Sequence, residues 1–319
     1  MTAPGVFFHV GYPKCASTFL QHQVFAQASD LNAFCPESFA PTLFCDRAAT
    51  DYSEAERHAQ FMQIPRSLED RYRVDRAAMD FTEDERATRL GAIRDAVIAD
   101  NRPAIFSSED MCVGPWQDDP RYYTTDDPER ISARIKHYFP DATIVLCLRP
   151  QADWIESWWR QKVNGFLTDM PARMLEQPFW RDRLLPRLRY DETIRRYREL
   201  FGADRVEGLF LGVPDWRMES RNEGRSNGYL YAKLYSNRIY LAASRALFSE
   251  AFCKKELDNR YHQMWKRYLA HGDRLMLPLS GKRVLRGDRR VAIDDMFRDS
   301  NAALAEMLGI DLAPYGFRV

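Results

Sequence analysis

The sequence contains few cysteine residues, and they are not spaced to bind a metal. Six cysteines are scattered over 319 residues, without a CxxC pair and without a Cys/His cluster at the spacing of a zinc site. Secreted disulfide scaffolds are much denser in cysteine. We therefore expect reduced thiols, as in a cytoplasmic protein, and no bound metal.

Long apolar runs and an excess of one charge are missing as well. No segment approaches the ~20 consecutive apolar residues of a membrane-spanning helix. The first residues, MTAPGVFFHVGYPK, lack the basic start and the apolar stretch of a signal peptide. The 46 Lys and Arg residues balance 46 Asp and Glu residues. Binding to nucleic acid or to an anionic membrane through bulk charge is therefore not expected.

Apolar residues, by contrast, make up 45% of the chain, which excludes a disordered protein. Short apolar runs predict strands over Val6–Val10, Asn32–Cys35, Pro103–Ser107, Ala142–Leu148 and Val206–Leu211. The segments between them predict helices over Ser17–Ala28, Leu90–Ala99, Pro128–Phe139, Ala152–Val163 and Asp191–Phe201. This alternation predicts a three-layer α/β/α fold, in which a parallel sheet has helices on both faces.

We expect one domain over residues 1–319. Its α/β core spans residues 1–211 and carries an insertion at about 36–100, where charged residues are frequent. Residues 212–319 are predicted to be mostly helical, with loops that act as lids. A last helix is expected near Ile293–Leu308, closed by Gly309, because glycine suits the C-cap of a helix.

Three of the predicted strands end in polar loops, at Gly11–Thr18, at Ser107–Asp110 and at Arg149. The carboxyl ends of parallel strands lie at one edge of a sheet, where such folds bind their ligands. We therefore expect these three loops to share one rim and to form the binding site.

The first of these loops has the composition of a phosphate-binding loop. A strand, a turn with Gly and Pro, Lys14, and then Ser17-Thr18 at the start of a helix would present N–H groups and a helix dipole to an anion. It is not a Walker A loop, which requires Lys directly before the Ser or Thr. The predicted fold is therefore P-loop-like. The alternative interpretation is a plain strand–turn–helix with a solvated Lys14 and Ser17 as N-cap.

Two segments resemble the core motifs of sulfotransferases, enzymes that use 3′-phosphoadenosine 5′-phosphosulfate (PAPS) as donor. His9–Gln21 resembles their 5′-phosphosulfate loop, which begins Tyr-Pro-Lys. Ile144–Ser157, a strand ending in Arg149 with Ser157 eight residues later, resembles their 3′-phosphate site. The tail, including Phe297–Asn301 and Leu304–Leu312, is similar to that of bacterial carbohydrate-type members.

The resemblance implies a role for each matching residue. Lys14 would contact the sulfuryl group and the bridging oxygen, and Arg149 and Ser157 would hold the 3′-phosphate. The 5′-phosphosulfate would lie against Cys15, Ala16, Ser17 and Thr18, and the adenine would stack on Phe19. The family commonly has Gly where this chain has Ala16; if that position requires a positive φ, Ala adds strain of ~1 kcal/mol.

The resemblance also implies a C-terminal basic segment that closes over the nucleotide. The stretch Leu279–Arg290, with Arg286-Gly287, loosely resembles it. The polar loop Arg221–Asn227 is the alternative.

Glu109 is the expected general base, because it follows the Pro103–Ser107 strand and so reaches the rim that carries Lys14. Bacterial family members have a stretch similar to Ser107-Ser108-Glu109. The alternatives are that Glu109 only caps a turn, or that a histidine is the base, although His9, inside the first strand, is expected to be packed.

The function that the resemblance implies is PAPS-dependent transfer of a sulfuryl group to a hydroxyl, on a carbohydrate or a glycolipid, without a metal. A small phenol or alcohol is the alternative acceptor. One alternative is a P-loop kinase, in which Glu109-Asp110 binds magnesium. The other is a nucleotide-binding module without activity.

Overall fold

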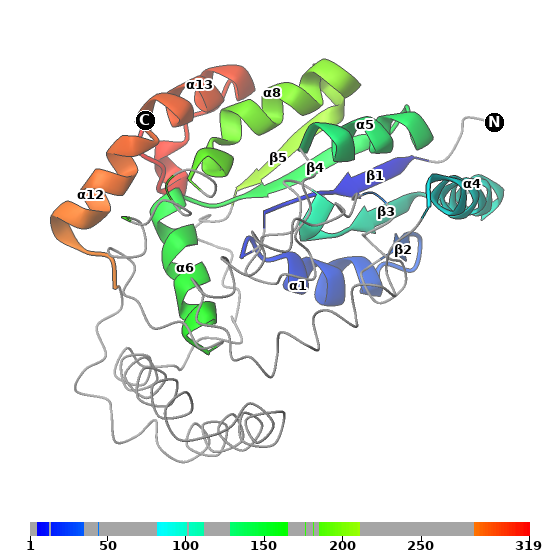
Figure 1. Ribbon diagram of the computed structural model, residues 1–319, viewed down its shortest axis with the longest axis horizontal. Coiled ribbons are helices and arrows are strands. Elements are labelled where there is room, and N and C mark those ends of the chain that lie inside the picture. The colour runs from blue at the N-terminus through cyan, green and yellow to red at the C-terminus, as the bar shows by residue number, and fades with distance from the viewer. Residues whose placement is uncertain are drawn as a thin grey trace, which may run out of the picture.

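The computed structural model describes residues 5–12, 14–34, 44, 82–100, 102–111, 128–164, 176, 181, 185–210 and 284–319. Within them lies a five-stranded sheet in the order β2-β3-β1-β4-β5, in which every pairing is parallel (Figure 1). The strands are β1 (Val6–His9), β2 (Asn32–Phe34), β3 (Ala104–Ser107), β4 (Thr143–Leu148) and β5 (Val206–Phe210). The parallel sheet predicted from the sequence is thus confirmed.

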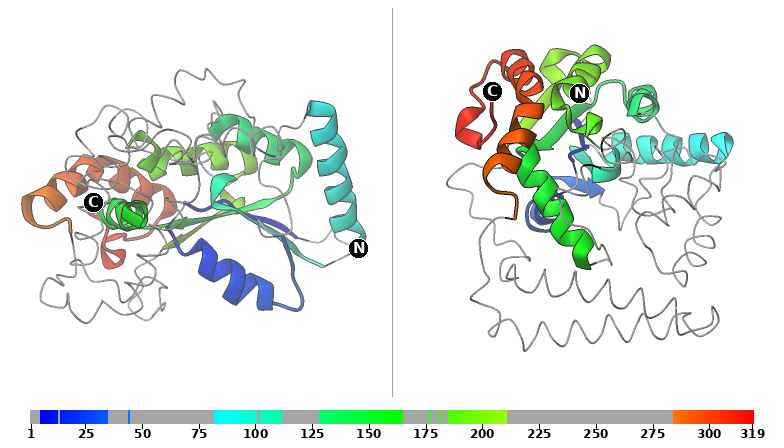
Figure 2. Two further views of the ribbon diagram at one scale, coloured as in Figure 1. Left: turned by 60° about the horizontal axis from the view of Figure 1, so that its bottom comes forward. Right: turned by 60° about the vertical axis from the view of Figure 1, so that its left-hand side comes forward.

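Helices cover both faces of this sheet, as the left view of Figure 2 shows. One face carries a helical segment that begins as α1 (Ser17–Phe19), continues as a π-helix (Leu20–Val24) and ends as a 3₁₀ turn (Phe25–Gln27). The other face carries α5 (Pro128–Tyr138) and α8 (Tyr190–Phe201). The architecture is therefore the three-layer α/β/α arrangement expected.

The two faces of the sheet differ in chemistry because side chains alternate along a strand. On the face toward α5, Phe8 stacks on Phe106 with 4.8 Å between ring centroids, and Phe139 packs on Phe8 at 5.1 Å. On the face toward α1, the last residues of β1 and β3 are His9 and Ser107, both fully buried. One face is thus an aromatic core, and the other carries polar groups at its carboxyl end.

Helix α4 (Glu83–Asp100) connects β2 to β3 and begins seven residues before the predicted Leu90. Its start is a capping box, a signal that the sequence contains. The N–H of Glu85 donates to Oγ1 of Thr82 at 3.2 Å, and the N–H of Thr82 donates to Oε2 of Glu85 at 2.9 Å. Helix α4 occupies the second part of the segment 36–100; residues 45–81 lie outside the described residues.

The described C-terminal residues, 284–319, contain two helices where the sequence predicts one near Ile293–Leu308. Helix α12 (Gly287–Met296) is followed by α13 (Arg298–Leu308), and the break falls at Phe297, whose ring is buried. Gly309 closes α13 with φ 66°, as predicted for a C-cap. The predicted basic loop Leu279–Arg290 was wrong at its C-terminal end, because residues 287–290 form the first turn of α12.

Helix α6 (Gln151–Asn164) follows β4 and carries three buried tryptophans, Trp154, Trp158 and Trp159. Among the described residues, the remaining short elements are the 3₁₀ turns η4 (Glu109–Met111), η7 (Pro186–Leu188), η8 (Ala203–Arg205) and η12 (Ala313–Tyr315). No helix in the described part of the chain is both long and apolar enough to cross a bilayer.

Candidate functional site

Three neighbouring strands bring the predicted site residues to one rim. Strands β3, β1 and β4 lie side by side, and Glu109, Lys14 and Arg149 follow their carboxyl ends. The Arg149 guanidinium donates through Nη1 to the carbonyl oxygen of Lys14 at 3.3 Å. Burial lowers the pKa of Lys14; the nearby Glu109 carboxylate acts to raise this pKa, and the Arg149 charge acts to lower it. Glu109 and Arg149 therefore both lie close enough to act on the Lys14 ammonium.

The loop that carries Lys14 has an unusual backbone. Lys14 has φ 66° and Ala16 has φ 68°, both in the left-handed region that glycine prefers. Gly is common at the position of Ala16 in the motif that this loop resembles. The backbone there does have a positive φ, and Ala at such a position costs about 1 kcal/mol of strain. Between the two, Cys15 is buried and its N–H donates to the carbonyl of Tyr12 at 3.2 Å.

Two contacts hold this loop in place. The Tyr12 side chain is fully buried, and its hydroxyl donates to the carbonyl of Arg187 at 2.9 Å and bonds Oγ1 of Thr193 at 2.7 Å. Gly11 passes so close to β4 that a Cβ there would lie 2.9 Å from the backbone nitrogen of Cys147. The loop is therefore fixed against both β4 and α8, which keeps the strained conformation in place.

The helix that follows the loop starts with an unpartnered hydroxyl. Ser17 is 3% exposed, and its Oγ has no hydrogen-bond partner among the described residues. The first helical hydrogen bond there runs from the N–H of Leu20 to the carbonyl of Ala16 at 3.0 Å, so the first-turn amides point out of the helix end. A buried donor without a partner is uncommon, and here it lies where an anion would be held.

The remaining residues predicted to bind the nucleotide are Thr18 and Phe19 on the first helix, Arg149 after β4, and Ser157 on α6. Phe19 is half-buried against the core, and the side chain of Thr18 lies outside the description. Arg149 is held through its carbonyl, which accepts a hydrogen bond from the Tyr190 hydroxyl at 2.8 Å. Ser157 is half-buried on α6, about two turns beyond the start of that helix.

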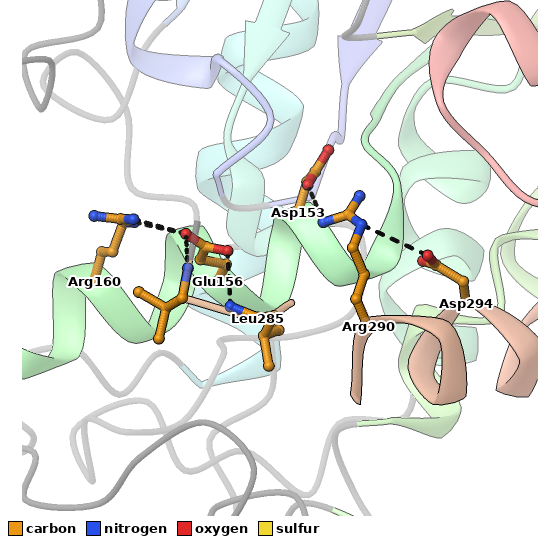
Figure 3. Close-up of polar contacts among 7 residues, drawn as sticks. Asp153, Glu156, Arg160, Leu285, Arg290 and Asp294 are labelled. Carbon is orange, nitrogen blue, oxygen red and sulfur yellow. Dashed lines mark hydrogen bonds and ion pairs between the residues drawn. The ribbon is translucent and has the colours of Figure 1, made fainter. Parts of the chain in front are cut away.

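Helix α6 also binds the segment that carries Arg286 (Figure 3). The buried Glu156 carboxylate accepts hydrogen bonds from the backbone N–H of Val284 at 2.9 Å and of Leu285 at 3.3 Å. The same carboxylate pairs with Arg160 at 2.7 Å. Arg286 therefore lies next to a segment fixed on the residue that precedes Ser157 in the chain.

A second ion pair joins α12 to α6. Nη1 of Arg290 lies 2.6 Å from Oδ1 of Asp153, and its Nε lies 3.6 Å from Asp294 (Figure 3). Arg286 is exposed at the N-cap of α12, and Gly287 follows with φ 54°. The alternative lid, Arg221–Asn227, lies outside the described residues.

Sequence reasoning missed the Glu156 contact. The only local signal was the i,i+4 spacing of Glu156 and Arg160, which is equally typical of an exposed ion pair. The partner amides are more than a hundred residues away in the chain. For the base, the structure distinguishes two candidates: Glu109 is half-buried at the rim, whereas His9 is fully buried and burial lowers its pKa to about 4.

Neither a protein-family model nor a curated protein sequence matches this chain. Among solved structures, the chain is similar to the crystal structure of a sulfotransferase from Alicyclobacillus acidocaldarius. The two share 14% sequence identity over 99% of each chain, with a TM-score of 0.47. A similarity at this level does not identify an activity, so the function has to be argued from the site.

Proposed function

We propose that this protein is a sulfotransferase that moves a sulfuryl group from PAPS to a hydroxyl of a carbohydrate or glycolipid. The observation that carries the proposal is the meeting of Lys14, Glu109 and Arg149 at adjacent strand ends, around a loop with two left-handed residues. A cation, a carboxylate and a second cation at one rim are the groups that such a transfer needs.

The residues of the loop suit the 5′ end of the donor. The Ser17 hydroxyl and the amides of the first helical turn bind the 5′-phosphosulfate, which gives the buried Ser17 Oγ the partner that it lacks. Cys15 and Ala16 line the same loop, Thr18 adds a hydroxyl, and Phe19 stacks on the adenine.

Arg149 and Ser157 suit the 3′-phosphate. The planar guanidinium of Arg149 bonds two phosphate oxygens at once, which a lysine does not do. Arg286 and Gly287 contribute to the same end of the donor, because the segment before them is bound to Glu156, the neighbour of Ser157. Sulfuryl transfer of this kind requires no metal ion.

In the reaction, Glu109 takes the proton of the acceptor hydroxyl as the acceptor oxygen forms a bond to sulfur. The bond from sulfur to the bridging oxygen of the 5′-phosphate breaks, and the electron pair stays on that oxygen. Lys14 stabilises the negative charge that develops there. Its lowered pKa is consistent with a partly desolvated ammonium, in which the electrostatic effect on the leaving group is strong.

Calorimetric titration with 3′-phosphoadenosine 5′-phosphate, in the absence of magnesium, tests the proposal. We expect micromolar binding, about −8 kcal/mol, that is lost in Arg149→Ala. Arg94→Ala is the matched control, because Arg94 is an exposed arginine on α4 whose ion pair is with the neighbouring Asp95. Equal loss in both variants would contradict a specific role for Arg149.

Two other outcomes would replace the proposal. Magnesium-dependent binding of ATP without binding of the bisphosphate would make a P-loop kinase the better description. Binding of the bisphosphate with no turnover of any carbohydrate, phenol or alcohol acceptor, and no effect of Glu109→Ala, would indicate a nucleotide-binding module without activity.

A further inference from the structure

A buried polar network lies directly beneath the three loops of the site. Nδ1 of His9 is 2.7 Å from Oγ of Ser107, and Nε2 of His9 is 3.2 Å from Sγ of Cys147. Gln21, from the π-helical turn, donates to both Oγ and the carbonyl of Ser107 at 3.1 Å. All four side chains are buried. The network therefore joins β1, β3, β4 and the first helix.

The network has two consistent arrangements of donors and acceptors, one for each neutral tautomer of His9. Burial keeps His9 neutral, with a pKa of about 4, and burial raises the pKa of the Cys147 thiol to about 12. Gln21 donates to Ser107 Oγ in both arrangements. Either the serine hydroxyl donates to Nδ1 of His9 and the Nε2–H donates to Cys147 Sγ, or the Nδ1–H donates to Ser107 Oγ and the Cys147 thiol donates to Nε2. The network carries no charge at neutral pH.

Each strand that the network joins carries one site residue close beyond it. Ser107 precedes Glu109 by two residues, Cys147 precedes Arg149 by two, and His9 precedes Lys14 by five. His9 and Ser107 are also partners in the register of β1 and β3. One more backbone bond, from the N–H of Ser108 to the carbonyl of His9 at 3.1 Å, extends the contact into the loop.

We propose that the four side chains of this network are positioning residues. They fix the positions, relative to one another, of the three loops that carry Lys14, Glu109 and Arg149. Directional hydrogen bonds define the relative position of three strand ends more narrowly than apolar contacts, which tolerate sliding. Apolar side chains would fill the same volume, as they do on the opposite face of the sheet. The proposal rests on the function proposed above for the three positioned residues.

The test uses Ser107→Ala, which removes the hydroxyl shared by His9 and Gln21 while Gln21 keeps its bond to the Ser107 carbonyl. The matched control is Ser132→Ala. Ser132 is also fully buried, on α5 across the sheet, and its hydroxyl donates to the carbonyl of Glu129 at 3.0 Å. Two variants of His9 are compared as well. The amide of His9→Asn can still bond Ser107, whereas the ring of His9→Phe bonds neither Ser107 nor Cys147.

Two quantities are measured beside the melting temperature. One is the Kd for 3′-phosphoadenosine 5′-phosphate. The other is the pH midpoint of Lys14 acetylation by limiting acetic anhydride, followed by mass spectrometry, which needs no ligand. We expect Ser107→Ala and His9→Phe to weaken binding about five- to tenfold, the effect of one lost hydrogen bond. The Lys14 midpoint should move by about half a unit or more, and His9→Asn should recover most of both effects.

One result would overturn the proposal: Ser107→Ala lowers the melting temperature as much as Ser132→Ala does, but changes neither the Kd nor the pH midpoint of Lys14. The network would then have a purely structural role. If the wild type does not bind the bisphosphate, the proposed function fails. The Lys14 midpoint still decides in that case, because it reports the placement of Glu109 and Arg149 around the ammonium without any nucleotide.

Discussion

The two faces of the central sheet serve different purposes although they are built from the same strands. Toward α5, Phe34, Phe106 and Phe8 form a continuous aromatic stack, with 4.7 and 4.8 Å between successive ring centroids. Toward α1, the carboxyl ends of the strands hold a neutral polar network under three charged residues. The aromatic face buries large apolar rings that stabilise the fold, whereas the polar face places the loops. Substitutions on the two faces should therefore affect different measurements.

The largest effect on stability is expected in the aromatic stack. Phe106 is fully buried between two rings, so Phe106→Ala should lower the free energy of unfolding by about 3–5 kcal/mol. Urea denaturation measures this change. A loss below about 1 kcal/mol would mean that the stack can collapse around the missing ring, and the contrast between the faces would weaken.

Lys14→Met should change activity and leave stability nearly intact. Removal of one group that stabilises the leaving charge typically lowers kcat by about 10²–10³. The measurement is transfer from PAPS to an acceptor found by screening, with melting temperature as the control for folding. Full activity of Lys14→Met would contradict the role proposed for this residue.

The burial of His9 should make the free energy of unfolding depend on pH. Its pKa in the folded protein is about 4, below the value of 6.5 that is usual for a histidine, because the ring is buried. Protonation therefore favours the unfolded chain, and the stability present above pH 6.5 is lost as the pH falls toward 4. Between pH 7.5 and 5 the loss from this group is about 2 kcal/mol.

Unfolding by urea at the two pH values checks this prediction. His9→Asn cannot protonate, so its stability should change less between pH 7.5 and 5 than that of the wild type. Equal changes in both proteins would mean that another group dominates the acid response.

Glu156→Gln should act on the donor site through the C-terminal segment. The carboxylate accepts two backbone hydrogen bonds and pairs with Arg160, and a neutral amide does so poorly. We expect binding of 3′-phosphoadenosine 5′-phosphate to weaken about tenfold, or about 1.4 kcal/mol. Glu192→Gln is the control, since Glu192 forms an ion pair with Arg189 at the exposed start of α8. If Glu156→Gln binds 3′-phosphoadenosine 5′-phosphate as tightly as the wild type, the segment before Arg286 does not contribute to donor binding.

The smallest effect is expected from Ala16→Gly. Ala16 has φ 68°, which glycine adopts without strain. Relief of the strain should stabilise the folded protein by at most about 1 kcal/mol, partly offset by the greater entropy of glycine in the unfolded chain. Melting temperature measures the balance. A clear loss of stability would show that the Cβ of Ala16 packs favourably.

Most of the fold was predictable because its signals are local. The apolar run of β4, the capping residues at Thr82 and Glu85, and Gly309 after α13 each act over a few residues. The π-helical turn at Leu20–Val24 was not predicted, and Gln21 in this turn bonds Ser107, which is 86 residues away in the chain. The break at Phe297 was missed for a similar reason, because this ring is buried and the helices on either side pack on different partners.

The residues of the site could be predicted from the sequence, because a lysine, a carboxylate and an arginine each follow an apolar run. Parallel strands bring the residues that follow them to one edge of the sheet. Which strands are neighbours depended on the fold, because β1 pairs with segments far away in the chain. Phe8 lies beside Phe106 of β3, 98 residues away, and beside Ile144 of β4, 136 residues away. The same holds for the links from His9 to Ser107 and from Glu156 to the amides of Val284 and Leu285. Hydrogen bonds between distant segments form only once the chain has packed, and local sequence patterns carry no record of them.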